Sequence, residues 1–507
     1  MISSLEWILY LSGALVVLGY WRFRKAVNMV SNFPGMRLLV SPMSPPGLLL
    51  PALPFPLWTY PGFSFPWELK HAGLFGIFKC DTVSLCAADG RAILFTADVP
   101  FITKMSSYAS RETFPKPVDE YKVLSYLGSN LIKVHEALHL VAKDSTLRIA
   151  LPAWTMSLPL RRMRRMKLAF TILEAELKRL ADERKAFHLR QTLNNEQLSN
   201  GRLPDNRSDL LNNLVRAAMM DEGDLEKGPT GSLVTSSIQK GLTDEEIIGN
   251  TYIYFLAGHE TTAHSLAWTL ALLAAYPEYQ DEAVQEINRV WPSTTAAFEP
   301  FYENTSFDDY PKFPFVLACY AETLRLFPPV QMIPKVAAQD VSISLETTNQ
   351  DTTTVAQGAD TNLRPSKEVD PFFTSQDSYT SAPHTNFVVK KDTIIMIDPP
   401  GVHYNPRYWE NPEKFDPGRF MRPYNKDAYI PFGVGHRACL GRKFSEVESV
   451  AMLVHVLRNY SVHLMPTSPD GEIDINLSRE RFSKASVRIT LTPSEVPLIF
   501  RRRIHQA

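Results

Sequence analysis

The chain has 507 residues, of which 45% are hydrophobic and 21% are charged, a composition typical of a globular enzyme. This length alone suggests two or three domains, although large enzymes with one core also reach it. The formal net charge of -1 gives no basic field for binding nucleic acid, so we expect no nucleic-acid partner.

The chain has few cysteines. Its four cysteines, Cys80, Cys86, Cys319 and Cys439, contain no C-x-x-C spacing. A disulfide framework or a zinc cluster is therefore not expected. This usage is typical of proteins in a reducing compartment.

The N-terminus is strongly apolar. Residues 2–21 carry one charge, Glu6, and Arg22, Arg24 and Lys25 follow at once. About twenty apolar residues suffice to span a bilayer as a helix, and no cleavage site of a signal peptide follows. We predict a transmembrane signal anchor over residues 2–21, in contact with membrane lipid, with the remaining chain in the cytosol. A buried core helix or an interfacial helix is the alternative.

Residues 22–70 are predicted to form a proline-rich strap near the membrane. Prolines recur from Pro34 to Pro66 and exclude helix there, so the apolar run 48–67 is not a second span. The aromatic side chains of this run either lie against the bilayer or pack on the core, and both interpretations stay open. Residues 71–507 are predicted to form the catalytic domain.

Two short strands are predicted early in this domain. Thr82–Leu85 and Ala92–Thr96 are rich in residues that favour strands, and Asp89-Gly90 between them is typical of a turn. We therefore expect a β-hairpin at this point.

An H-E-x-x-H match follows at His135, Glu136 and His139. Two histidines four residues apart on a helix could hold zinc, with the glutamate as base. No third ligand is identifiable, and such a match also arises by chance. A zinc peptidase is therefore kept only as a remote alternative.

A long helix is predicted from Thr243 to about Ala275. Thr243 and Glu246 form a capping box, and Pro277 ends the helix. The boundaries of this helix are thus given by local signals at both ends.

The middle of this helix carries a candidate site. Gly258 has no side chain, so a flat ligand could press against the helix there. Glu260 places an acid beside the hydroxyl of Thr261, and such a pair can relay the protons that O–O cleavage requires. The alternative is a kinked helix with a threonine bonded to its own backbone.

Glu322 and Arg325 lie one turn apart on a helix that ends at Pro328-Pro329. They share a helical face and can form an ion pair. Most such pairs are solvated and weak, so the spacing alone assigns no role.

Residues 346–386 have a different composition. Thr, Ser, Asp, Gln and Asn dominate, and apolar residues are sparse. We predict a disordered surface insertion between two strands and assign it no chemistry.

The most informative segment is 432–441, which reads F-x-x-G-x-R-x-C-x-G. It presents Cys439 in a glycine-rich loop. A thiolate in such a loop suits haem iron, because it pushes electron density into the metal and favours O–O cleavage. The glycines let the backbone approach a flat macrocycle, and Arg437 can pair with a haem propionate. The alternative is a buried structural cysteine.

With this pattern, the chain resembles the cytochrome P450 family. Residues 114–117 and 121–130 are most similar to its membrane-bound fungal members. The resemblance implies a mainly α haem-thiolate fold with a small β portion and one N-terminal transmembrane helix. It also implies that Cys439 is the axial ligand of the iron of haem b. The other residues expected to bind this cofactor are Phe432, Gly433, Arg437, Gly441 and Gly258.

The resemblance assigns further roles. Glu260 is implied as the acid and Thr261 as the alcohol of a proton relay to bound O2. Residues 415–420 resemble the loop that adds an arginine, here Arg419, to the Glu322–Arg325 pair. This structural triad locks the core behind the haem. Residues 330–336 resemble the strand that lines the substrate pocket, and a simple core strand is the alternative.

The implied reaction inserts one oxygen atom of O2 into an apolar organic substrate. The sequence has no flavin or nicotinamide fingerprint, so electrons are expected from an NADPH-cytochrome P450 reductase. The implied location is the endoplasmic reticulum membrane, with a single pass and a cytosolic catalytic domain. The alternative of a reductase-independent haem-thiolate isomerase or dehydratase is disfavoured by the Glu260-Thr261 pair.

One region departs from the family. After residues 131–136 the family continues with a helix whose Trp and Arg hold the propionates, whereas this chain reads Ala137-Leu138-His139-Leu140. We hypothesise an internal deletion near Glu136/Ala137, by exon skipping or a faulty gene model. A haem-poor, inactive truncated product is then a further alternative. An uninterrupted main transcript that reads through this junction would contradict a faulty gene model.

Overall fold

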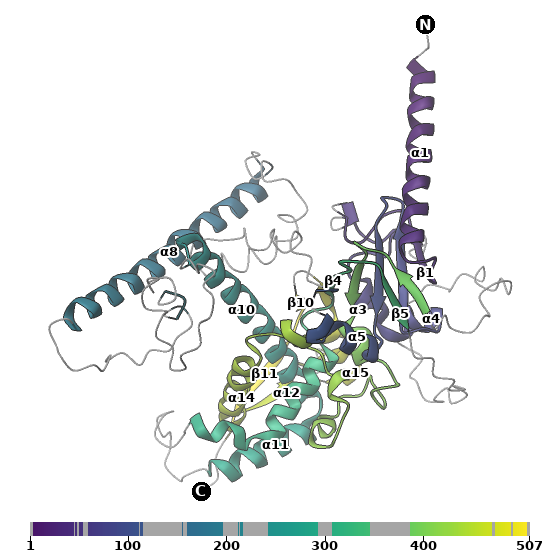
Figure 1. Cartoon of the computed structure of the whole chain (residues 1–507). Helices are drawn as coiled ribbons and strands as arrows, with labels where there is room; N and C mark the ends of the chain where they lie inside the picture. Colours follow the sequence, from purple (N-terminus) through teal and green to yellow (C-terminus); the bar gives the residue numbers. More distant parts are fainter. Residues whose placement is uncertain are drawn as a thin grey trace.

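A computed structural model gives the fold, which is mainly helical with a small amount of sheet, as predicted (Figure 1). The structure describes residues 4–44, 46–47, 50–53, 59–110, 112–114, 155, 160–195, 211, 213–215, 242–292, 307–344, 386–468, 472–487 and 490–503. The principal helices are α1 (Ser4–Met29), α3 (Phe65–Lys70), α4 (Gly76–Phe78), α5 (Val99–Ser106), α8 (Arg161–Asn195), α10 (Asp244–Ala275), α11 (Pro277–Val290), α12 (Pro314–Leu326), α13 (Pro399–His403), α14 (Arg442–Asn459) and α15 (Ile475–Ser483). The strands are β1 (Gly35–Leu38), β2 (Thr82–Ala87), β3 (Ala92–Thr96), β4 (Ile333–Val336), β5 (Val341–Ser344), β6 (Asn386–Val389), β7 (Ile394–Ile397), β8 (Tyr460–Leu464), β9 (Ala485–Val487), β10 (Leu491–Pro493) and β11 (Leu498–Arg502).

The largest sheet has five strands in the order β1-β2-β3-β7-β4. β2 and β3 pair antiparallel, while β1 and β7 join them in parallel. The predicted hairpin is confirmed, with β3 at the expected bounds and β2 extended to Ala87. Gly90 in its turn has a φ of 93°, which glycine adopts without strain.

Helix α1 joins the sheet at one end only. Ala26, Val27 and Val30 at this end are buried in the core of the sheet, whereas Val16 and Trp21 are exposed. Figure 1 shows the N-terminal part of α1 projecting away from the rest of the molecule. Among the described residues, no helix is both long enough and apolar enough to cross a membrane. The helix itself is present, but the anchor over residues 2–21 stays a prediction.

The proline-rich strap is ordered against the core where it is described. Tyr60 and Phe65 are buried, and Phe65 packs edge-on against Phe95 of β3. This packing supports the core interpretation for these residues. The exclusion of helix up to Pro66 was wrong at the end of the strap, because α3 begins at Phe65. Proline is tolerated in the first turn of a helix, where its missing N–H has no partner to lose.

Helix α10 begins and ends where the sequence predicts. The Thr243 hydroxyl accepts a hydrogen bond from the Glu246 amide, and the Glu246 carboxylate accepts one from the Thr243 amide. The helix ends at Ala275, and Pro277 begins α11. The capping box is therefore confirmed as a two-way contact.

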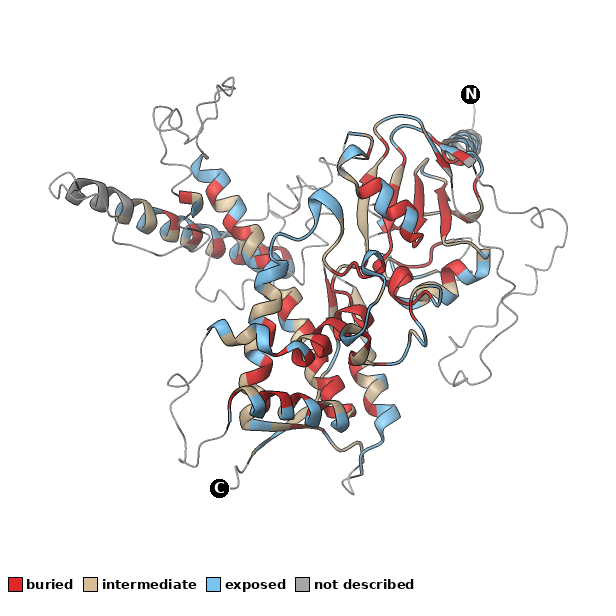
Figure 2. Cartoon of the chain, turned by 60° about the horizontal axis from the view of Figure 1, so that its bottom comes forward, coloured by how far each residue is buried: buried red, intermediate tan, exposed pale blue. Residues whose placement is uncertain are grey.

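A second core lies where α10, α11, α12 and α14 pack together (Figure 2). Trp268 of α10 is fully buried at its centre and stacks on Phe327, with ring centroids 4.8 Å apart. The indole N–H of Trp268 donates to the carbonyl of Phe482, so its polar atom is satisfied. This helical core supports the candidate site.

Several predictions fall outside the described residues. These are the H-E-x-x-H match at 135–139, the proposed deletion point at 136/137 and most of the insertion. The insertion does connect two strands, because β5 and β6 pair antiparallel with Ser344 opposite Asn386. Its predicted end at residue 386 was one residue too late, since Asn386 already belongs to β6.

The capping box leads to a first prediction. Thr243→Ala removes the acceptor for the Glu246 amide, so we expect the free energy of unfolding to fall by about 1 kcal/mol. The midpoint of urea-induced unfolding measures this loss. Thr243→Ser keeps a hydroxyl and should stay close to the parent protein. An equal loss in both variants would show that the cap does not act through its hydrogen bond.

Candidate functional site

The loop around Cys439 is closed by its own backbone. The Cys439 amide donates to the carbonyl of Phe432 over 2.8 Å, which brings the two ends of the motif together. Gly433 and Gly435 have φ values of 69° and 72°, in the left-handed region that favours glycine. The loop then enters α14 at Arg442, with Cys439 exposed just before the helix.

Gly435 also lets the loop approach α5. A Cβ atom at this position would lie 1.9 Å from the carbonyl oxygen of Ser106, the last residue of α5. No side chain fits in that space. The glycine is therefore needed both for its φ value and for the close contact that supports the cysteine loop.

Cys439 differs from the other three cysteines. Cys86 and Cys319 are buried, and Cys80 is partly buried. Burial raises the pKa of the Cys80 and Cys86 thiols, and it raises the pKa of the Cys319 thiol well above its ordinary value. These thiols stay protonated and unsuited to a metal. Of the four, only Cys439 is exposed.

The candidate relay residues lie on α10. The Thr261 hydroxyl donates to the Ala257 carbonyl over 2.7 Å, which is the backbone bond that the structural alternative requires. This bond leaves the oxygen of the hydroxyl free to accept a proton donor. A Cβ atom at Gly258 would meet no atom within 4 Å, so helix packing does not demand glycine there.

Glu260 has a partner that the sequence did not reveal. The hydroxyl of Thr490 donates to the Glu260 carboxylate over 3.3 Å, although 230 residues separate the two. Thr490 is buried immediately before β10. Thr490 belongs to no recognisable motif in the sequence. Only the fold identifies it as a partner of Glu260.

Ser445 connects α14, the helix that follows the cysteine loop, to both α10 and α12. The Thr262 hydroxyl lies 3.4 Å from the hydroxyl of Ser445, in the first turn of α14. Ser445 lies 2.9 Å from the hydroxyl of Tyr320 on α12. The structure thereby brings the neighbour of Thr261 and the helix after Cys439 together.

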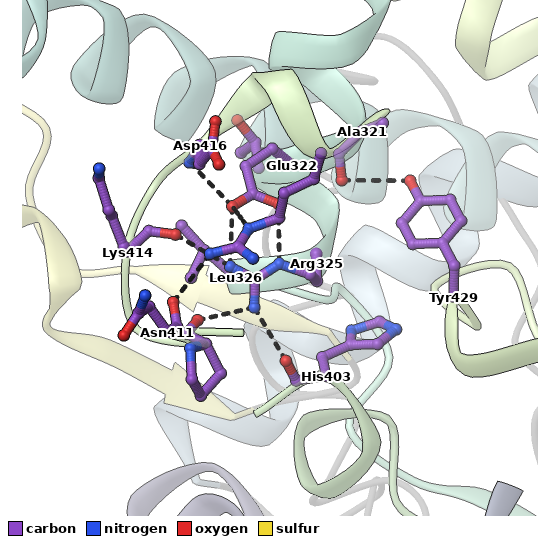
Figure 3. Close-up of polar contacts among 12 residues, drawn as sticks. Ala321, Glu322, Arg325, Leu326, His403, Asn411, Lys414, Asp416 and Tyr429 are labelled. Carbon is purple, nitrogen blue, oxygen red and sulfur yellow. Dashed lines mark hydrogen bonds and ion pairs between the residues drawn. The ribbon is translucent and has the colours of Figure 1, made fainter. Parts of the chain in front are cut away.

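The predicted Glu322–Arg325 pair is formed and completely buried (Figure 3). The two side chains make a bidentate contact, with N···O distances of 2.7 and 2.8 Å. Burial alone would lower the pKa of Arg325, but its bonds to the Glu322 carboxylate more than offset this, and the pKa is raised. Arg325 therefore remains charged inside the core.

Arg419 joins this pair as predicted. Its Nε donates to the Glu322 carboxylate over 3.3 Å, and the Asp416 amide donates to the same carboxylate over 3.0 Å. The remaining N–H groups of Arg325 reach the backbone carbonyls of His403, Pro412 and Lys414. Figure 3 shows these donors and acceptors between α12 and the segment of residues 403–419.

The comparisons with known proteins agree with this geometry. A sequence profile described as cytochrome P450 matches residues 122–354 and 379–492, well over half of the chain. The chain belongs to the cytochrome P450 family. Proteins of this family named monooxygenases are oxidoreductases, and the same class applies to this chain.

A fungal relative matches this P450 over nearly its whole length. "Cytochrome P450 monooxygenase 124" of Postia placenta is 27% identical over 571 aligned positions, covering 95% of this chain and 96% of the relative. The alignment is longer than the whole 507-residue chain, so this chain lacks residues that the relative has. This agrees with a missing segment but does not locate it at Glu136/Ala137.

Two further matches are more limited, one in the length that it covers and one in its sequence identity. "Cytochrome P450 6B6" of Helicoverpa armigera is 24% identical over 302 residues, 58% of this chain and 49% of that protein. A cyanobacterial P450 solved with retinoic acid bound is 16% identical, with a TM-score of 0.55, and the match covers 93% of this chain and all of that chain. The second match supports the P450 fold alone.

The remaining predicted cofactor residues of this P450 occupy the cysteine loop. Arg437 is exposed in a short 3-10 turn, and Phe432 lies beneath the guanidinium group of Arg442, 5.5 Å from its ring centroid. A Cβ atom at Gly441 would lie 3.9 Å from the Cys439 sulfur. These contacts gather the predicted residues of the loop around one thiol, and Thr262 and Ser445 tie its helix to α10.

The buried triad leads to a second prediction. Glu322→Gln leaves the charge of Arg325 unpaired in the core, so we expect the free energy of unfolding to fall by about 3–5 kcal/mol. Glu480→Gln is the matched control, because it removes an exposed ion pair with Lys484 and should change stability little. Urea-induced unfolding of both variants makes the comparison. Equal losses would contradict a special role for the buried pair.

Proposed function

We propose that this chain is a haem-thiolate monooxygenase that inserts one oxygen atom of O2 into an apolar organic substrate. The observation that carries the proposal is the Thr262–Ser445 contact, which joins the helix that carries the acid and the alcohol to the helix that follows the exposed thiol of Cys439. The reductase-independent alternative has no use for Glu260 and Thr261, and we place it second.

The residues present fit haem b. Cys439 offers an accessible thiol, the open face at Gly258 leaves room for a flat ring, and Arg437 is free to face solvent and a propionate. When bound, haem supplies the redox chemistry that activates O2. In this proposal Cys439 is the iron ligand, and Phe432, Gly433 and Gly441 shape the loop around it.

The protein's own contribution is the handling of protons. Glu260 accepts a proton from solvent and passes it toward the hydroxyl of Thr261. The bond from Thr490 fixes one carboxylate oxygen of Glu260, which orients the acid. The bond from Thr261 to Ala257 directs the proton of the hydroxyl toward the helix backbone and leaves the lone pairs of its oxygen available to accept.

Two segments form the proposed walls of the substrate pocket. Ile333 of β4 lies near the cysteine loop, because a Cβ atom at Gly433 would be 3.7 Å from its side chain. The amide of Leu491 in β10 donates a hydrogen bond to the carbonyl of Pro329, which lies shortly before β4. The side chains of Ile333 and Leu491 are apolar, and we propose that these two segments flank a pocket for an apolar organic substrate.

Electrons come from an external NADPH-cytochrome P450 reductase in this proposal. Arg437, Arg442 and Lys443 are exposed beside the cysteine loop and offer positive charge to an acidic partner. Arg442 also forms an exposed pair with Glu446, so it is the least available of the three. Arg437 is assigned to a haem propionate, so the proposed docking surface is centred on Lys443.

We further propose a single-pass location in the endoplasmic reticulum membrane, with the catalytic domain in the cytosol. The support is the exposed apolar surface of α1, including Val16, Val17 and Trp21, combined with the basic residues at 22, 24 and 25 that follow this apolar run within the same helix. Extraction of expressing membranes with alkaline carbonate tests this proposal. Release of the full chain into the supernatant would contradict it.

The CO difference spectrum of reduced membranes tests the function. We expect the strongly red-shifted band of thiolate-ligated haem in the chain as it stands, and its loss in Cys439→Ser. Cys319→Ser is the matched control, because that thiol is buried and should leave the band in place. A parent chain with haem but without the shifted band would contradict Cys439 ligation. A parent chain without haem would favour the truncated, haem-poor alternative.

The proton relay gives another prediction. Thr490→Val removes the donor to Glu260, and we expect about a tenfold rise in the fraction of electrons lost to hydrogen peroxide, because protons reach the site less reliably. Peroxide formed per NADPH consumed, with purified reductase, measures this. Thr490→Ser should restore the parent ratio. If the Thr490→Val variant forms no more peroxide per NADPH than the parent, Thr490 does not orient Glu260.

A further inference from the structure

A cluster of buried hydroxyl groups lies behind the cysteine loop. Tyr320, Thr262 and Ser265 are almost completely inaccessible to solvent, and Ser445 is partly buried between them. They come from α12, α10 and α14, which pack against one another (Figure 1). Apolar side chains would fill such a junction at less cost, since a buried hydroxyl needs a partner.

Each hydroxyl of the cluster has a specific contact. Ser445 lies 2.9 Å from the hydroxyl of Tyr320 and 3.4 Å from that of Thr262. Burial raises the pKa of Tyr320, against the smaller opposing effect of nearby serine hydroxyls, so its hydroxyl stays protonated and able to donate. The three groups therefore form a continuous contact across three helices.

The cluster also touches both halves of the proposed site. The Ser445 amide donates to the carbonyl of Gly441 over 2.8 Å, two residues after Cys439. On α10, the Ser265 hydroxyl donates to the carbonyl of Thr261 over 2.7 Å. Ser445 is thus connected to the cysteine loop through the start of its own helix, and to the neighbour of Thr261 through its contact with Thr262.

We propose that Ser445 and Tyr320 are positioning residues that set the place of the Cys439 loop against the Glu260–Thr261 segment. The inference rests on the proposed function for its consequence, but the coupling between the two helices stands on the contacts alone. The hydroxyl contact fixes direction as well as distance, which apolar packing at the same point would not do. Neither residue touches the reacting atoms.

The first arm of the test needs no haem. Amide hydrogen exchange is followed by mass spectrometry in the full apo chain for Ser445→Ala, Tyr320→Phe and the parent. We expect faster exchange in residues 258–266 of α10, although both substitutions lie on other helices. Thr323→Val is the matched control, because it removes a buried hydroxyl from α12 that bonds only to its own helix. A response no larger than the control would overturn the proposal.

The second arm follows the consequence for the cofactor in haem-loaded protein. We expect the transfer of haem to apomyoglobin to become about tenfold faster in Ser445→Ala and Tyr320→Phe, with no further increase in the double variant. Ser445→Thr, which keeps the hydroxyl, should restore the slower transfer. Additive effects, or no rescue, would overturn the proposal.

The two arms separate this inference from the proposed function. If the parent binds no haem or lacks the shifted CO band, the proposed function fails while the exchange arm still decides the coupling. If the band is present but the exchange of residues 258–266 is unchanged in Ser445→Ala, the positioning role fails and the proposed function stands.

Discussion

The structure depends on the burial of two opposite charges, Glu322 and Arg325. A charge inside a core is tolerated only when bonds satisfy it, and here backbone carbonyls supply the missing acceptors. Those carbonyls belong to residues 403–414, so the chain between the sheet and the cysteine loop must wrap around α12. Arg419 completes the arrangement from the far end of the same loop. The triad thereby determines where the segment leading to Cys439 can lie.

The sequence predicted those parts of the fold that have local causes. The capping box at Thr243, the stop at Pro277 and the hairpin turn at Gly90 each arise from a few neighbouring residues, and each is confirmed. The order of the five-stranded sheet has no such cause. β3 pairs with β7 some three hundred residues later, and no periodicity in either strand indicates its partner. The proline-rich strap is a second example. Its prolines argue against helix, but they do not indicate which part of the core the strap packs against.

The site divides in the same way. The long motif around Cys439 indicates its chemistry from residue type and spacing, whereas the Glu322–Arg325 spacing predicts that an ion pair can form but not that it is buried. Thr490, Ser445 and Tyr320 are single polar residues in ordinary segments, and they acquire meaning only when the fold places them beside Glu260 and Thr262. The role of the Thr261 hydroxyl in a proton relay stays a prediction, because its bond to Ala257 belongs equally to the structural alternative. The positions of these polar residues in the fold therefore limit the roles that each of them can have.

The junction between α1 and the sheet has a mechanical consequence. The amide of Lys390 donates to the carbonyl of Met29, and the Ser31 hydroxyl donates to that of Val388, so β6 and its neighbours grip the end of the helix. Together with the buried Ala26 and Val30, these bonds join the end of the helix directly to the core of the sheet. Any surface that holds the projecting part of α1 therefore also acts on the sheet to which the helix is joined. A change in the angle of the helix axis would strain these bonds unless the sheet turned with it.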